Sequence, residues 1–103
     1  MSNPIKREYD KLSLTKDIIE RESIVNQFQT TGFLNRNDAI EKITALQIVD
    51  AELALATKAK QDASGGVNLY QVDDNLIITN IQFQINFLKA KLAKLELEEK
   101  ANG

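Results

Sequence analysis

The side chains that could do chemistry in this chain are carboxylates, lysines, tyrosines and hydroxyls, because its 103 residues include no histidine and no cysteine. Histidine is the commonest general base near neutral pH and the commonest metal ligand. Without cysteine there are no disulfides, thiolate metal sites or thiol nucleophiles. Serines and lysines are both present, but no spacing supports a Ser–Lys pair. We therefore expect a protein that is not an enzyme.

Two short segments have residue types that can bind ions. Asp73 and Asp74 are adjacent carboxylates, but they do not converge on one cation unless the backbone turns sharply, and the alternating ligands of a calcium-binding EF-hand loop are absent. Ser64-Gly65-Gly66 could form a small anion nest, yet it lacks the spacing of a phosphate-binding loop. We predict a helix cap at the aspartates and a helix stop at the glycines. No cofactor and no metal is expected.

No part of the chain has a basic excess that would attract nucleic acid or an anionic membrane, because the net charge of −2 is spread evenly. There is no run of about 18 apolar residues that could span a bilayer, and the N-terminus lacks the apolar segment of a secretory signal. We expect an intracellular, cytoplasmic protein or a part of a larger assembly. The most basic cluster has five lysines with three glutamates beside it: Lys58, Lys60, Lys89, Lys91, Lys94 and Glu96, Glu98, Glu99.

These residues must be positioned by helices, because apolar residues recur at helical spacing along most of the chain. We predict one domain over 1–103 with helices at about 4–31, 38–63 and 74–100 and an extended loop at 64–73. Pro4 suits a first helical turn, Gly32 suits a helix end, and Asn37 suits an N-cap. Ser13 and Thr15 could also cap a new start, which would break the first helix near 12–15. Phe33 and Leu34 lie between the first two predicted helices, and we expect both side chains to pack into the core.

The segment 80–88, NIQFQINFL, fits two templates. As a strand it alternates apolar and polar residues, and 67–88 would then form a β-hairpin in an α+β protein. As a helix it belongs to a row of apolar residues with coiled-coil spacing. Because strong helix formers follow it directly, we predict the helix and an all-α fold with an antiparallel helical hairpin or coiled-coil core. Gln84 and Lys91 would flank this row at a wet edge. The row is Ile78, Ile81, Ile85, Leu88, Leu92 and Leu95.

The same helix has a second apolar side with Phe83 and Phe87, which points away from Ile81. A helix that is apolar on two sides needs two neighbours, so the second side must meet the first helix or another copy of the chain. We predict a structural or assembly subunit that self-associates or binds a partner protein. The alternative is a small regulatory or inhibitory protein that binds an enzyme or a nucleic-acid machine. The predicted interface comprises Ile81, Phe83, Ile85, Phe87, Leu88, Leu92 and Leu95, with Leu69 and Tyr70 of the loop as a second contact.

Overall fold

The computed structural model describes residues 3–63, 65 and 68–102, and all regular structure within these residues is α-helical. The all-α prediction is therefore confirmed, and the β-hairpin alternative is wrong, because 80–88 lies inside a helix. Ser64, Gly66 and Val67 of the predicted stop and loop lie outside the described residues. The elements are α1 (Pro4–Thr31), α2 (Arg36–Val49), α3 (Ala51–Ala63) and α4 (Asp74–Asn102).

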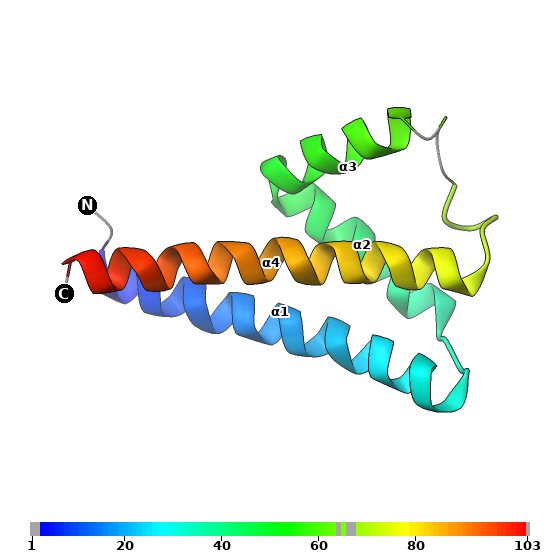
Figure 1. Cartoon of the computed structure of the whole chain (residues 1–103), viewed down its shortest axis with the longest axis horizontal. Helices are drawn as coiled ribbons and strands as arrows, with labels where there is room; N and C mark the ends of the chain where they lie inside the picture. Colours follow the sequence, from blue (N-terminus) through cyan, green and yellow to red (C-terminus); the bar gives the residue numbers. More distant parts are fainter. Residues whose placement is uncertain (1–2, 64, 66–67, 103) are drawn as a thin grey trace.

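The two longest helices, α1 and α4, run antiparallel and side by side, so that both ends of the chain lie at the same end of the molecule (Figure 1). Ion pairs across the pair follow the antiparallel order: Lys11 contacts Glu99 at 2.8 Å and Glu22 contacts Lys89 at 3.3 Å. We expected the hairpin to join the second and last helices. The long pair is α1 with α4 instead, because only α2, half of the predicted second helix, packs along α4.

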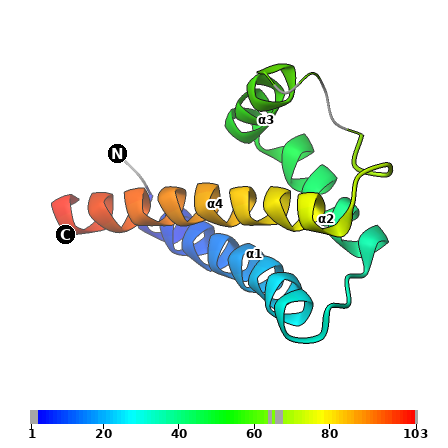
Figure 2. The ribbon, with the colours of Figure 1, turned by 45° about the vertical axis from the view of Figure 1, so that its right-hand side comes forward.

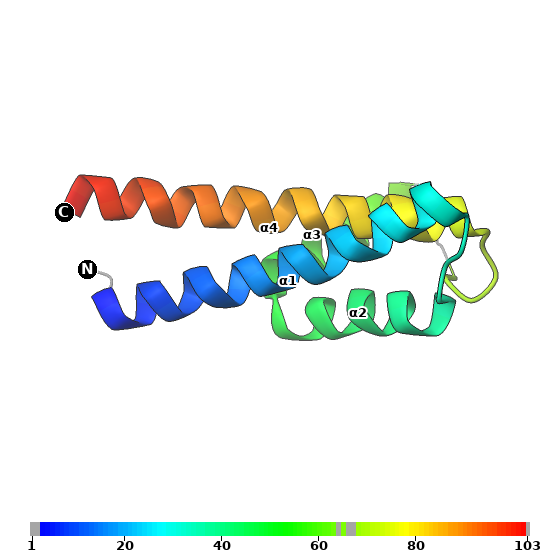
Figure 3. The same ribbon diagram turned by 90° about the horizontal axis from the view of Figure 1, so that it is seen from below.

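Helix α2 lies against the half of the α1–α4 pair that is far from the chain ends (Figure 3). Helix α3 then turns back from the end of α2 and does not continue along the pair (Figure 2). The other half of the α1–α4 pair therefore extends beyond α2.

The ends of α1 are set by local chemistry, and the predicted range of 4–31 is confirmed. The Asn3 side chain accepts the Ile5 N–H at 2.9 Å, and Pro4 occupies the first turn. Gly32 has a φ of 74° and donates its N–H to the Phe28 carbonyl at 2.8 Å, which closes the helix. There is no break at 12–15, where the Thr15 hydroxyl donates to the Lys11 carbonyl inside a continuous helix.

The predicted single helix over 38–63 is wrong, because the chain bends at Asp50, which has extended dihedral angles of φ −118° and ψ 103°. In a straight helix Asp50 would share the buried face of Ile43 and Leu46, and its carboxylate would enter the core. At the bend the carboxylate instead accepts the Leu53 N–H at 3.0 Å and caps α3. The start of α2 also differs from the prediction, since Asn35 and not Asn37 is the N-cap.

The core lies where all four helices meet, and Leu34 from the α1–α2 connection also contributes to it. Phe33, which we expected in the core, is exposed, because it follows Gly32 at the tip of the turn. The buried apolar side chains are Ile18 and Val25 of α1, Ala39, Ile40, Ile43 and Leu46 of α2, Leu53 of α3, and Ile77, Ile78, Ile81, Ile85 and Leu88 of α4.

A polar pair crosses this core. Arg21 is 3% exposed and Gln84 is 1% exposed, so the predicted wet edge at Gln84 is wrong. The Arg21 Nε donates to Gln84 Oε1 at 2.9 Å, and two further guanidinium N–H groups donate to the carbonyls of Asp17 and Lys42. The Gln84 amide donates to the Ile43 carbonyl at 3.0 Å. Burial lowers the pKa of Arg21. These hydrogen bonds connect α1, α2 and α4 and fix how the three helices are aligned along one another.

Candidate protein-interaction surfaces

The predicted interface residues on α4 divide into two groups. Ile81, Ile85 and Leu88 are buried, so they contribute to the core of this chain rather than to its surface. Phe83, Phe87, Leu92 and Leu95 are half-buried. As an interface, the set stays a prediction.

Phe83 and Phe87, on the second apolar side of α4, pack against the core and each has a lysine over its ring. The Lys60 ammonium of α3 lies 4.7 Å from the centre of the Phe83 ring, and the Lys91 ammonium lies 5.3 Å from the centre of the Phe87 ring. A cation over an aromatic face is attracted by the ring quadrupole, and its aliphatic stem covers apolar surface. Helix α3 was not separated from α2 in the sequence-based prediction, so this neighbour of Phe83 was missed.

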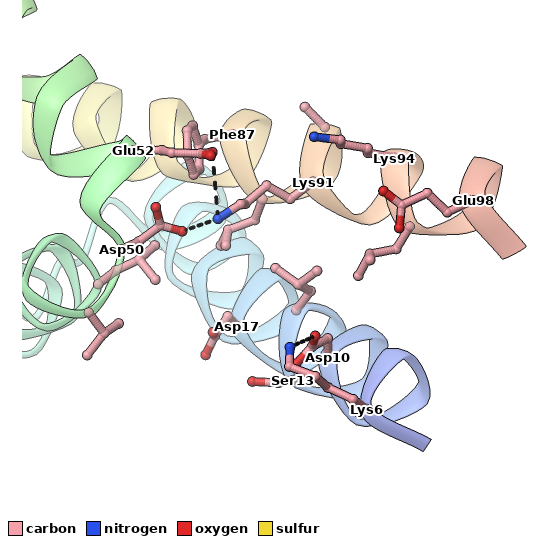
Figure 4. A pocket seen from close by; sticks show the side chains of 16 residues that line it. Lys6, Asp10, Ser13, Asp17, Asp50, Glu52, Phe87, Lys91, Lys94 and Glu98 are labelled. Carbon is pink, nitrogen blue, oxygen red and sulfur yellow. Dashed lines mark hydrogen bonds and ion pairs between the residues drawn. The ribbon is translucent and has the colours of Figure 1, made fainter. Parts of the chain in front are cut away.

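A groove follows the α1–α4 pair beyond the end of α2 (Figure 4). Its volume is about 790 Å³, and its apolar lining includes Leu14 of α1 and Leu88 and Leu95 of α4. The groove exists because α2 has 14 residues while α1 has 28 and α4 has 29, so no third helix covers this half. Its charged rim comprises Lys6, Asp10, Asp17, Asp50, Glu52, Lys91, Lys94 and Glu98.

Charges around the groove are mostly paired with each other. The Lys91 ammonium lies 2.6 Å from Asp50 and 3.9 Å from Glu52, and Lys6 lies 2.7 Å from Asp10. Burial alone would raise the pKa of Asp50, but hydrogen bonds from Lys91 and from backbone N–H groups outweigh it and hold that pKa below its usual value. Among the described residues, no group of three or more acidic side chains is placed to hold a metal ion. Because the carboxylates and lysines are paired and leucines line the groove between them, the groove suits contact with a protein segment better than proton transfer.

Four large apolar side chains project from α1 on the side opposite the core; we call them the outer stripe. They are Ile5 (82% exposed), Tyr9 (71%), Leu12 (66%) and Ile19 (60%). Tyr9 and the buried Ile18 are nine residues apart, which is about two and a half helical turns, so they face opposite ways. The sequence shows the helical spacing of Ile5, Tyr9 and Leu12. It does not show that this line faces outward.

The loop before α4 presents Tyr70 on the surface, while Leu69 is half-buried and packs on the core. Arg36 fixes this loop, because its guanidinium donates to Asp74 at 2.6 Å and to the Val72 carbonyl at 2.6 Å. Shallow hollows lie on either side of Tyr70, over Phe33 and over Ile48 of α2. The predicted cap at the aspartates is confirmed, since Asp73 accepts the Leu76 N–H at 3.0 Å.

Comparison with models of protein families, with curated proteins and with solved structures finds no match to this chain. Over the described residues, no helix is both long enough and apolar enough to cross a membrane.

Proposed function

We propose that this protein is a structural or assembly subunit, without catalytic activity, that contacts other protein chains through apolar helix faces. The observation that carries the proposal is the outer stripe. Soluble monomers expose large apolar side chains singly, whereas a contiguous exposed row is typical of a protein contact. Four such residues on one line of one helix, each more than half exposed, form a row of this kind.

The outer stripe also has the spacing and support that a contact helix needs. Successive members are four, three and seven residues apart, which is the coiled-coil pattern with Lys16 at the intervening position. The opposite face of α1 packs on α4 and α2, and both ends of α1 are capped. The stripe is therefore presented by a helix that is already formed, so that binding costs little ordering of the backbone.

A second candidate function, a regulatory or inhibitory protein, is supported by the groove beside α2. A groove between two helices that is lined by leucines and by charged side chains can accept an amphipathic helix from another protein. In that case the contact residues are Leu14 and Leu95 rather than the outer stripe.

Sedimentation of the tagged protein from the cells that make it tests the proposal. We expect the wild type to sediment in a complex and Tyr9→Glu to sediment as the free chain. Leu97→Glu is the matched control, because Leu97 is 66% exposed on α4 and lies outside the stripe and the groove. Free wild-type chain, or equal behaviour of all three proteins, would overturn the proposal. Loss of the complex with Leu95→Lys alone would favour the regulatory function.

A further inference from the structure

We infer that the outer stripe of α1 docks on the same stripe of a second copy, with the two helices antiparallel. This inference rests on the proposed function and names the partner. The four side chains of the stripe are each at least 60% exposed, so no other described helix of the chain covers them. From Ile5 to Ile19 it extends over about 21 Å of helix, at about 1.5 Å per residue.

The stripe is self-complementary when it is reversed. A twofold axis beside residue 14 places Tyr9 opposite Ile19 of the second copy, and Leu12 opposite Lys16 of the second copy. Tyr9 and Ile19 then pack on each other in both halves of the contact, and the aliphatic stem of Lys16 covers Leu12 while its ammonium reaches water. Ile5 meets Ser23 at each end of the contact. The same surface serves both copies, as a closed dimer requires.

The position of Lys16 in the stripe favours the antiparallel arrangement over the parallel one. In a parallel pair Lys16 would face Lys16 of the second copy inside the contact, and like charges there are unfavourable. In the antiparallel pair Lys6 flanks Glu20 of the second copy, which is an attractive pair on one edge. The other edge brings Glu8 near Glu22, with Lys11 at 4.0 Å from Glu8 and Lys89 at 3.3 Å from Glu22. Because Lys6 also has a neighbour of its own, Asp10 at 2.7 Å, the two edges offset each other and Lys16 decides the orientation.

Light scattering on the purified protein over a range of concentrations is the first test. We expect the mass to rise with concentration from 11.6 kDa toward twice that value. Tyr9→Glu is expected to stay at the monomer mass, and Leu97→Glu to behave as the wild type. A wild-type mass fixed at 11.6 kDa overturns the inference, as does equal association of Tyr9→Glu.

Single cysteines test the orientation, because the natural chain contains none. Thr15 is exposed on α1 beside the proposed axis, so two copies of Thr15→Cys are offset by roughly 3 Å along the helices while Lys16 is kept; for Lys6→Cys the offset is roughly 24 Å. A short bismaleimide linker should join Thr15→Cys into dimers and leave Lys6→Cys monomeric. Equal linking of both variants would indicate a parallel contact and would overturn the antiparallel one.

Failure of the inferred dimer can be distinguished from failure of the proposed function. If the purified protein is monomeric while Tyr9→Glu still loses its complex in cells, the second copy is excluded as the occupant and the proposed function stands with a different protein on the stripe. If Tyr9→Glu changes neither the purified mass nor the complex in cells, both are wrong.

Discussion

The polar pair of Arg21 and Gln84 makes a sharp prediction about how the core is stabilised. Gln84→Leu leaves the Nε of the buried guanidinium without its acceptor, while its bonds to the carbonyls of Asp17 and Lys42 remain, and loss of one hydrogen bond to a charged group costs about 1.5–3 kcal/mol. Arg21→Met removes the charge but leaves the neutral Gln84 oxygen unpaired, which costs about 1–3 kcal/mol. Each single variant is therefore expected to be clearly destabilised.

The double variant Arg21→Met/Gln84→Leu leaves neither side chain unpaired and fills the same space with apolar groups. Such replacements are near neutral or stabilising, so we expect the double variant to lie within about 1 kcal/mol of the wild type. Additive single costs would instead give a loss of about 2.5–6 kcal/mol. The coupling free energy between the two sites should thus be at least about 1.5 kcal/mol.

Urea unfolding followed by circular dichroism measures all four free energies of unfolding in this cycle. Gln29→Leu and Lys100→Met are the control pair, because both side chains are exposed on the same two helices and lie outside the outer stripe and the groove. We expect their effects to be small and additive. Additive effects at Arg21 and Gln84 would refute the reasoning, since they would mean that the two side chains do not depend on each other in the core.

Three further predictions concern the bend and the helix ends. Asp50→Ala removes the cap of α3 and the partner of Lys91 at 2.6 Å, and should cost about 1–2 kcal/mol, with faster amide hydrogen exchange at Leu53. Because the folded pKa of Asp50 is lowered, its contribution is complete above the unfolded value of about 3.9 and is lost as the pH falls through the folded value. The stability difference between wild type and Asp50→Asn, measured by urea titration, should therefore shrink only in that acid range. Gly32→Ala should cost about 1 kcal/mol in the urea midpoint analysis, because φ is 74° there and the space around the residue is open.

The ends of α1 and the helical state of 80–88 could be predicted because their signals are local. Pro4 and Gly32 set the limits of α1 through backbone restrictions of their own. The strand-like alternation around Phe83 is outweighed by strong helix formers that follow it in the same uninterrupted segment.

The bend at Asp50 could not be predicted, because its neighbours Ala51 and Leu53 favour a continuous helix. What ends α2 is the cost of burying the Asp50 carboxylate in a straight helix, together with Lys91, which is distant in sequence and close in space. Because α3 turns back at this bend, Lys60 of α3 lies over Phe83. The sequence pattern had indicated α1 or another copy of the chain as the neighbour of Phe83.

The candidate surfaces could be predicted only in part, because they too depend on how helices that are distant in sequence pack together. Ile81, Ile85 and Leu88 have the pattern of a contact face, and the pattern does not say whether the contact is within the chain or between chains. Tyr9 and Ile18 lie on two apolar lines of α1, and which of them is buried depends on where α4 packs. An amphipathic pattern with two apolar lines is nevertheless a signal that one line has a partner outside the helix pair.

The measurement that tests the central claim most directly is the solution mass of the purified wild type and of Tyr9→Glu, compared by light scattering at matched concentrations. An outer stripe that joins copies predicts a wild-type mass that rises above 11.6 kDa with concentration, and a Tyr9→Glu mass that does not. Equal masses for the two proteins at every concentration would contradict the claim.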